Sequence, residues 1–496
     1  MLNAGTVNVA SGATFGSSGT ANGNVNVKGT LAPGGTVGIM TVDGNVSFAS
    51  GSTALFDVGQ TASDQLAVSG AVTIASGATL SLAAVQNNPL KPGRSIDLIV
   101  ANGGITGSFT TINKPASILG FVVQRATRIS LLGQFLADNC FSVPATSAVN
   151  YVNSILTGGQ TSAALLNAIP SLLTAGGNTN AAAFAQLTPE AFASATQIGT
   201  DNGLAVAGAM RHMEALRAPD GGGLFVFAQG LGAWSRLNGN AGLGTSRATQ
   251  SGGGVLGGIG FGSGTVSISG FVGYINARQT IAALGSRTTS DGVVAGASAH
   301  LASGGFSGTA TFAYDASSAD TKRPVPGGVS EVSHYRLRST TFDIDVGYNL
   351  PIGKSWQVRP QVGFTSVRTK RGTAVETGSS GAFDFTISRA SQSANFIDGG
   401  LRIEAAPTST KMFRPWLDLG VRHLLDADTR FAIAILTGGP LGITVPGATR
   451  ARTVATIGAG FNALVSRNIK LFAGYDGAFG TGTSGNKVNG GIKVSF

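Results

Sequence analysis

The side chains that most often do chemistry in proteins are few in this chain of 496 residues, which holds four histidines and one cysteine. The histidines have no metal-binding spacing, so we expect structural roles for all four: His212, His300, His334 and His423. The single cysteine, Cys140, excludes an internal disulfide. The run Gly252-x-Gly254-x-x-Gly257 has the letters of a dinucleotide-binding loop, but it lies inside a predicted strand with no helix after it, and we interpret it as chance.

The sequence also offers little support for acid–base or nucleophilic catalysis. Residues 1–140 hold five carboxylates, all Asp, and no histidine, which argues against a soluble repeat hydrolase. No Gly-x-Ser-x-Gly motif occurs in the sequence. We therefore expect a protein that is not an enzyme, with no catalytic residues, no cofactor and no metal site.

Charged side chains in the C-terminal half are the remaining candidates for a functional site. From residue 342 to residue 350 every second residue is apolar, and the residues between include Asp343 and Asp345. Buried charges of both signs are costly unless they are paired or hydrated, so we expect these faces to line a wet lumen. The candidate lumen-wall residues are Asp343, Asp345, Arg359, Arg402, Arg414, Asp418 and Arg452.

The elements that must position these charges are strands, because residues 224–496 alternate with a period of two. Most of the predicted strands are longer than the roughly 9–11 residues that a tilted strand needs to cross a bilayer. The pattern predicts an even number of strands, twelve, at 224–236, 248–262, 265–279, 289–303, 305–318, 339–352, 355–369, 393–406, 413–426, 451–466, 468–481 and 485–496.

The connections between these strands alternate in length. Those after even-numbered strands are short, at 263–264, 304, 353–354, 407–412 and 467. Those after odd-numbered strands are long, at 237–247, 280–288, 319–338, 370–392 and 427–450. Short turns at one end and long loops at the other are typical of bacterial outer-membrane barrels, so we expect a twelve-stranded antiparallel barrel that spans a membrane.

The second face of the predicted strands is apolar, with aromatic residues near the strand ends, where a membrane interface would place them. These aromatics are Tyr348, Trp356, Phe364, Phe413, Tyr475 and Phe479. A soluble core is the competing interpretation. It is disfavoured because twelve long strands that close around a polar interior leave no room inside for so much apolar surface.

A helix is predicted directly before the strands, ending near Leu216. Thr188 can cap it, Pro189 suits its first position and Glu190 faces the positive end of its dipole. Three glycines each lower its intrinsic stability by about 1 kcal/mol relative to Ala, so it needs support from a surrounding tube. We expect its polar residues to find partners on the lumen wall; they are Thr188, Glu190, Asp201, Asn202, Arg211, Glu214 and Arg217.

The N-terminal part of the chain has a different sequence pattern. In residues 1–132, short alternating runs lie between Gly-containing turns, and the phrase Ala-Ser-Gly-Ala/Ser-Thr begins at Ala10, Ala49 and Ala75. Such repetition favours stacked parallel coils, a β-helix, with a sandwich as the alternative. Four regions follow: 1–132 in strands, 133–186 helical, 187–223 the predicted helix and its linker, and 224–496 the barrel.

Composition agrees with an all-β membrane protein. Gly is 75 of 496 residues, charged residues are 11% and mean hydropathy is +0.23, yet polar residues interrupt every apolar run. The net charge of +10 is scattered with no basic run, so we expect no nucleic-acid binding. No basic or apolar leader follows Met1, and we interpret the chain as the C-terminal part of a longer protein or as one with a misplaced start codon.

Several segments together resemble the monomeric autotransporters of the type V secretion route, and the resemblance covers essentially the whole chain. They are Gly29-Thr30-Leu31-Ala32-Pro33-Gly34, Pro92-Gly93-Arg94-Ser95-Ile96-Asp97-Leu98-Ile99, Leu187-Thr188-Pro189-Glu190-Ala191 and the end at Phe496. The most specific piece is Asn489-x-Gly491-x-x-Val494-x-Phe496, which is similar to the last-strand signal that the barrel-assembly machinery reads.

The resemblance implies an outer-membrane barrel with a pore-threading helix, preceded by a short right-handed parallel β-helix that is the remnant of a passenger at the cell surface. It implies that residues 92–132 fold first and help to pull the rest outward. The implied partners are outer-membrane lipid, the barrel-assembly machinery and an unknown surface ligand of an adhesin-like passenger, and the implied state is a monomer. Self-cleaving relatives cut by asparagine cyclisation, for which Asn202-Gly203 is a candidate here. A porin-like channel with an N-terminal appendage remains the alternative.

Overall fold

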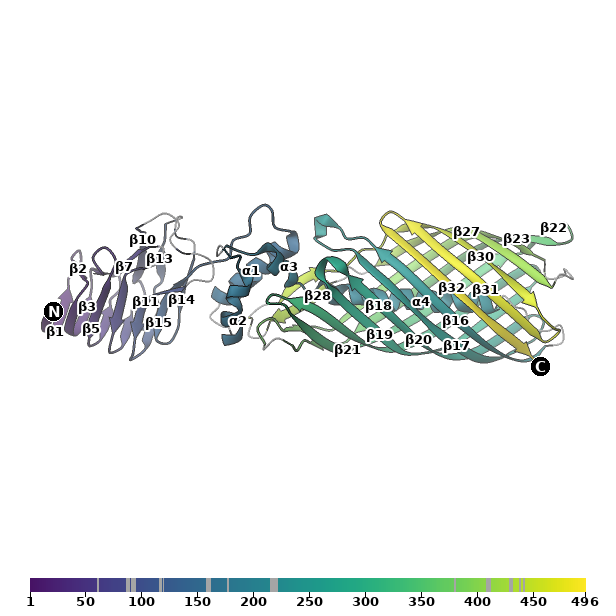
Figure 1. Ribbon diagram of the computed structural model, residues 1–496, viewed down its shortest axis with the longest axis horizontal. Helices are drawn as coiled ribbons and strands as arrows, with labels where there is room; N and C mark the ends of the chain where they lie inside the picture. The colour runs from purple at the N-terminus through teal and green to yellow at the C-terminus, as the bar shows by residue number, and fades with distance from the viewer. Residues whose placement is uncertain are drawn as a thin grey trace. The chain divides into compact units, whose positions relative to one another are not determined.

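The computed structural model describes residues 1–59, 62–85, 90, 95–115, 118, 120–157, 162–175, 178–214, 222–378, 381–406, 412–427, 431–436, 439 and 442–496. These residues form two compact units, one from Met1–Phe184 and one from Ala185–Thr437 with Gly442–Phe496. Figure 1 shows parallel sheets and short helices in the first unit and a barrel in the second. Among the described residues, no helix combines the length and the hydropathy needed to cross a membrane.

The first unit begins with stacked parallel strands, which confirms the prediction of parallel sheets. Thr30, Thr53, Thr79 and Thr111 occupy one register position on successive coils. The right-handed sense of the coils stays a prediction. The strands are β1 (Leu2–Val9), β2 (Thr14–Ser17), β3 (Thr20–Val27), β4 (Thr30–Pro33), β5 (Ile39–Asp43), β6 (Val46–Phe48), β7 (Thr53–Val58), β8 (Gln65–Val68), β9 (Val72–Ile74), β10 (Thr79–Ala84), β11 (Ser95–Ala101), β12 (Ile105–Gly107) and β13 (Thr111–Asn113).

The repeated Ala-Ser-Gly phrase forms the same turn each time. At the second copy the Ser52 amide donates to the Ala49 carbonyl at 3.1 Å, and Gly51 between them has a φ of 80°. A positive φ at the third position of a β-turn is what glycine supplies without strain. The Gly51 amide also donates to the Gly77 carbonyl of the next copy at 3.0 Å, so the turns stack with the strands.

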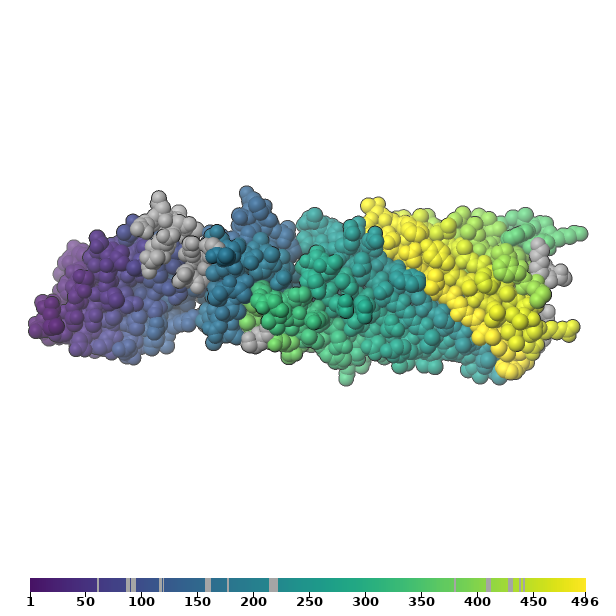
Figure 2. Space-filling model, viewed as in Figure 1, coloured from purple at the N-terminus to yellow at the C-terminus, as the bar shows by residue number. Residues whose placement is uncertain are grey.

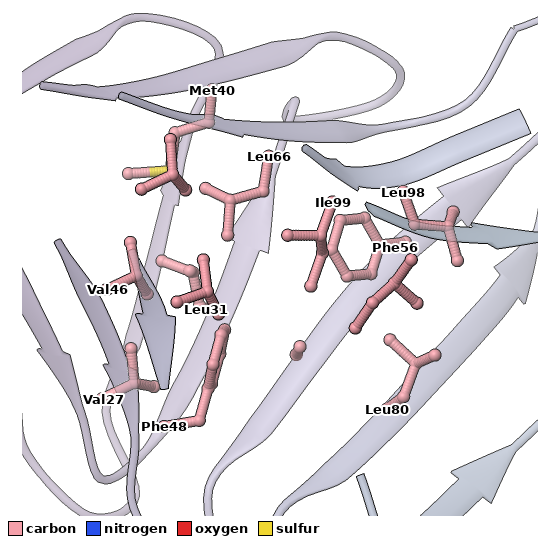
Figure 3. Packing of buried hydrophobic residues seen from close by; sticks show 14 of the residues in the cluster. Val27, Leu31, Met40, Val46, Phe48, Phe56, Leu66, Leu80, Leu98 and Ile99 are labelled. Atoms are coloured by element: carbon pink, nitrogen blue, oxygen red, sulfur yellow. The ribbon is translucent and has the colours of Figure 1, made fainter. Parts of the chain in front are cut away.

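An apolar core runs through the coils, because inward residues alternate with outward polar ones. Figure 3 shows Leu31, Phe48, Phe56 and Leu80 pointing toward one another between the strands. All four are nearly inaccessible to solvent. Each such side chain contributes about 1.5–3 kcal/mol by its burial.

The stack ends in antiparallel strands and short helices. Strand β15 (Arg128–Leu132) pairs antiparallel with β11 and with β14 (Phe121–Gln124), so parallel addition stops there. The helices that follow are α1 (Val143–Thr157), α2 (Ala163–Ala168), η1 (Ile169–Leu172) and α3 (Ala181–Gln186).

Twelve long antiparallel strands of the described chain close into a barrel, as predicted. Strand β32 pairs with β16 from Phe225 opposite Ser495 to Leu237 opposite Thr483, which completes the cylinder. Figure 2 shows these C-terminal strands, in yellow, directly against the first barrel strands, in teal. The strands are β16 (Gly223–Leu237), β17 (Ala248–Gly262), β18 (Val266–Ile281), β19 (Ser286–Ser303), β20 (Phe306–Val325), β21 (Val329–Tyr348), β23 (Trp356–Arg371), β26 (Ala390–Ala405), β27 (Phe413–Ala427), β30 (Thr453–Leu464), β31 (Ile469–Gly480) and β32 (Thr483–Ser495).

Two predicted loops have regular structure instead. The loop expected at 319–338 is mostly a continuation of β20 and β21, with Lys322 opposite Val332 and a tight turn near Gly327. Parts of the loops expected at 370–392 and 427–450 pair as a small sheet of β24 (Ala374–Val375), β25 (Phe385–Ile387), β28 (Phe431–Leu436) and β29 (Ile443–Pro446), which we call the loop sheet. A short β22 (Leu350–Ile352) extends the turn after β21, and η2 (Ala241–Leu243) and η3 (Ala282–Leu284) lie in two loops.

The helix α4 (Glu190–Glu214) lies within the barrel and contacts its strands on several sides (Figure 1). Every residue from 191 to 200 is buried, so this part of the helix fills its section of the lumen. The predicted pore-threading helix is therefore confirmed. Of the helix residues proposed to seek partners, Arg217 and the side chain of Glu214 lie outside the described residues.

Candidate functional site

The start of the pore helix follows its sequence signals. The Glu190 amide donates to the Thr188 hydroxyl at 3.3 Å, and Pro189 occupies the turn before the helix. Glu190 itself is fully buried, and its carboxylate accepts from the Ser246 amide at 2.6 Å and from the Ser246 hydroxyl at 3.2 Å. The loop after β16 thus holds the first turn of the helix in place.

Two of the helix glycines allow a close approach to the barrel wall. A Cβ at Gly199 would lie 2.1 Å from the Ser339 hydroxyl oxygen, and one at Gly203 would lie 2.4 Å from the Thr341 hydroxyl oxygen. Both hydroxyls belong to β21. The glycines therefore lower the helix propensity at positions where any side chain would clash, and the wall contact compensates for that loss.

The central part of the helix carries hydrogen bonds and an ion pair to the wall. Asp201 pairs with Arg450 and accepts from the Ser235 hydroxyl at 2.5 Å. The neighbouring Asn202 donates to Asp315 of β20 at 3.3 Å. Asp201 and Asn202 thus contact different parts of the barrel. Cleavage at Asn202-Gly203 stays a prediction.

The last turns of the helix are fixed by Arg211 and His212. Arg211 makes a bidentate pair with Asp343, with Nε and Nη2 donating at 2.8 and 2.6 Å to a carboxylate that is 0% exposed. Charge-assisted hydrogen bonds of this kind are roughly twice as strong as those between neutral groups, and the forked geometry adds specificity. His212 lies 2.7 Å through Nδ1 from the Asn489 side-chain oxygen and 3.5 Å through Nε2 from Asp476.

The remaining wall charges form pairs among themselves. Arg359 pairs with Asp345 at 2.5 Å, and Arg402 pairs with Glu404 at 2.8 Å and with Asp418 at 3.4 Å. These pairs line a cavity of about 800 Å³ in the part of the lumen below the filled section, together with Arg414. Charged side chains of both signs therefore line this cavity.

The seven proposed wall residues do not share one environment. Asp343, Asp345, Arg359, Arg402, Arg414 and Asp418 all line the cavity. Arg452 lies just before β30, is exposed, and belongs to a second, smaller pocket near Asp201.

Sequence reasoning missed the contacts that the long loops make with the helix. Arg323 is fully buried at the loop end of β20, where it pairs with Glu376 and donates to the Gln186 carbonyl at 2.9 Å, immediately before the helix. The Ala448 amide donates to the Ser194 hydroxyl at 3.0 Å. Charged residues in predicted loops gave no signal of this role, because the pairing depends on how the loops fold back.

One carboxyl in these loops has a shifted pKa. Burial, followed by the hydrogen bond and the negative charge of Glu331, raises the pKa of Asp384 to about 7, while Arg323 opposes the shift. A carboxyl whose folded-state pKa is raised favours the folded loop below its usual pKa and loses that contribution as pH rises toward 7. The contribution of this carboxyl to the stability of the folded loop is therefore larger at acidic pH than at neutral pH.

The predicted assembly signal is divided between the two faces of β32. Asn489 is buried and contacts the pore helix, and Gly491 would place a Cβ 2.3 Å from the Ala228 carbonyl oxygen. Phe496 is 69% exposed and its amide donates to the Leu224 carbonyl at 2.8 Å, while Val494 on the same face is partly exposed. Only the outward pair presents side chains away from the lumen.

Comparison with known proteins identifies the architecture. The model of the autotransporter β-domain family matches residues 226–476, from β16 to β31. The chain belongs to the autotransporter β-domain family. No curated protein matches the chain in sequence. Membership places this β-domain in the bacterial outer membrane as a translocator barrel.

Solved autotransporter structures resemble this β-domain in fold. The translocator domain of NalP from Neisseria meningitidis has a TM-score of 0.50 at 15% identity, with 62% of this chain and 99% of that chain covered. The transport unit of AIDA-I from Escherichia coli has a TM-score of 0.42 at 15% identity, covering 61% and 99%. The β-domain of the Bordetella autotransporter BrkA has a TM-score of 0.41 at 17% identity, covering 55% and 100%.

The four histidines and the acidic residues are side chains of the kinds that can bind metal ions. Within the described ranges, no group of three or more His, Cys, Asp or Glu side chains is placed to hold a metal ion. His300 and His423 each contact a threonine hydroxyl, at 3.1 and 2.8 Å, and His334 pairs with Asp320 at 2.9 Å.

Proposed function

We propose that this autotransporter β-domain delivers its own N-terminal unit to the cell surface and then anchors it there through α4. The observation that carries the proposal is the helix in the lumen, tied to the wall by the Arg211–Asp343 pair. A chain that runs through the barrel in this way connects the strands to whatever precedes the helix. Loop residues form hydrogen bonds with the first turns of α4, at Glu190 and Ser194. These bonds would hold the helix in place after translocation has ended.

The N-terminal unit would then be a passenger with a binding role rather than a catalytic one. Its parallel coils expose polar ladders such as Asn8 and Asn26, whose side chains are hydrogen-bonded at 3.0 Å. A regular polar surface on a rigid stack suits an adhesin-like function. The ligand is a component of the cell's surroundings that the coil surface recognises.

Assembly of the barrel would depend on the outward side chains of the last strand. Phe496 and Val494 face away from the lumen, where the barrel-assembly machinery could contact them. Asn489 and Gly491 would contribute by shaping the closed barrel, since both lie on the lumen side. We propose that the assembled protein is a monomer, because one chain closes its own cylinder.

Labelling of Cys140 on intact cells tests the delivery. Cys140 is exposed and lies in the N-terminal unit, so a membrane-impermeant maleimide should modify it without permeabilisation. Cys140→Ser should abolish the signal. A matched control places a cysteine at Ser303, the last residue of β19 before the short turn to β20, in the Cys140→Ser background, and it should react only after permeabilisation. Modification of Cys140 that also needs permeabilisation would refute surface delivery.

A further inference from the structure

The outer surface of the barrel carries a band of cations near its long loops. The residues lie on adjacent strands from β18 to β23, where the strands approach or leave the loops, and all are exposed. They are Arg278, Arg287, Lys322, Arg336, Arg338, Arg368 and Lys370. The end with long loops faces outward in outer-membrane barrels, so this band lies on the outer side of the membrane.

The level of the band follows from the apolar face of β21 and β22. Every second residue from Phe342 to Ile352 points outward, and all of these outward residues are exposed and apolar. Ten residues at about 3.3 Å each, on a strand tilted by about 40°, give an apolar band about 25 Å tall, which matches the hydrocarbon layer. The next outward residues along β21 are Thr340, Arg338 and Arg336, so the cations begin where the lipid headgroups lie.

Within this band, like charges face each other across neighbouring strands. Arg338 of β21 is directly opposite Lys370 of β23, and Arg287 of β19 is directly opposite Lys322 of β20. Side chains at directly paired positions have Cβ atoms about 4.5–5.5 Å apart, and like charges there destabilise a sheet. Such an arrangement is relieved when an anion lies between the two cations.

The Arg338–Lys370 pair is the centre of a larger group. Arg368 follows on the same face of β23 and Arg336 on the same face of β21, each diagonal to the opposite member of the pair. We call Arg336, Arg338, Arg368 and Lys370 the four-cation cluster. In the part of the chain that the structure describes, no ion pair joins a member of this cluster to a carboxylate, and Arg368 donates only to the Ser391 hydroxyl at 3.2 Å.

Nearby carboxylates on the outer face already have partners. Asp320 pairs with His334 at 2.9 Å, and Asp291 accepts from the Tyr274 hydroxyl at 3.2 Å. These two carboxylates therefore interact with residues of β21 and β18 that lie outside the four-cation cluster. The cluster keeps an excess of positive charge.

We propose that the four-cation cluster binds the phosphate groups of an anionic glycolipid of the outer leaflet. Three guanidinium groups match phosphate oxygens with their planar forks, and Lys370 adds a compact charge. The acyl chains of such a lipid would lie on the apolar band directly below, next to Phe342 and Phe364. A phosphate between Arg338 and Lys370 turns a repulsive pair into two charge-assisted contacts.

Native mass spectrometry of the full chain in a neutral detergent tests this site. The probe is a diphosphorylated lipid A-type glycolipid, compared with the same lipid after removal of both phosphates. The wild-type protein should retain the phosphorylated form and not the other. Arg338→Gln with Lys370→Gln should weaken retention by about thirtyfold, the effect expected for two cations near a charged surface.

A matched control replaces two exposed cations at the loop end that have no cation opposite them, Arg236 and Arg247, with glutamine. This control should retain the glycolipid as the wild type does. Equal weakening in the control, or equal retention of the lipid without phosphates, would overturn the proposal.

A second measurement separates the site from a structural role. In neutral detergent without glycolipid, the Arg338→Gln with Lys370→Gln variant should unfold at a higher temperature than the wild type, because a repulsive pair is removed. With the phosphorylated glycolipid present the order should reverse. A variant that is less stable in both conditions would show that the two residues support the strand pairing and do not form a lipid site.

Discussion

At the scale of single residues, the ion pair between α4 and β21 joins two side chains that are buried to different extents. Asp343 is 0% exposed on β21, whereas its partner Arg211 on the helix is 21% exposed by its side chain. The arginine also lies 3.9 Å from Asp398, so it has a second carboxylate within reach. Loss of the arginine should therefore cost more than loss of the aspartate.

Substitutions at this pair test that order. Arg211→Gln leaves a buried carboxylate with only the Thr365 hydroxyl as a side-chain donor and should lower the free energy of unfolding by about 3 kcal/mol. Asp343→Asn should cost less, because Arg211 can turn to Asp398. Urea titration of the detergent-solubilised protein, followed by tryptophan fluorescence, measures both. The double variant Arg211→Gln with Asp343→Asn should cost less than the sum of the two single variants, and a cost equal to that sum would contradict the pairing.

At the scale of elements, the strands could be predicted and their partners in the loops could not. The predicted strand around Phe342 began at residue 339, because residues 329–338 are mostly polar, whereas β21 begins at Val329. The loop sheet was missed because its strands are two to six residues long and join segments about fifty residues apart. The partner of Asp201 was missed for the same reason, since Arg450 lies in a loop.

The role of the helix glycines shows the same limit. Their low propensity indicated that the helix needs a surrounding wall, but only the register of β21 shows which of them touch it. Gly199 and Gly203 face hydroxyls at clashing distance, whereas a Cβ at Gly208 would meet only a carboxylate oxygen of Asp476 at 3.5 Å. Helix propensity and packing thus oppose each other at two positions and not at the third.

Substitution of these glycines separates propensity from packing. Gly203→Val should push α4 from the wall and speed proteolysis of the helix in the folded barrel, because its side chain would clash with Thr341 and Val367. Gly208→Ala is the matched control and should be tolerated, with a gain of up to about 1 kcal/mol from helix propensity. Limited proteolysis followed by mass mapping of residues 190–214 reports the difference. Equal protection of the two variants would mean that the helix does not pack on β21.

At the scale of the whole molecule, the barrel and the helix together account for how the polar groups of the chain are satisfied in a membrane. A cylinder with every strand paired leaves no edge in the lipid, and its apolar outer face meets the hydrocarbon layer while the charges at that level turn inward. The inward charges would be costly in an empty apolar space, and the helix and the cavity beside it supply partners and water. The N-terminal unit is compact by itself and has its own apolar core.

Disulfide trapping between helix and wall tests this account most directly. In a Cys140→Ser background, cysteines replace Asn202 on the helix and Asp315 on the lumen face of β20, whose side chains are hydrogen-bonded at 3.3 Å. Oxidation of isolated outer membranes should join them, whereas Asn202→Cys with Ala316→Cys, on the exposed face of the same strand, should stay reduced. A disulfide to residue 316, or none to residue 315, would show that α4 does not occupy the lumen of the membrane-embedded barrel.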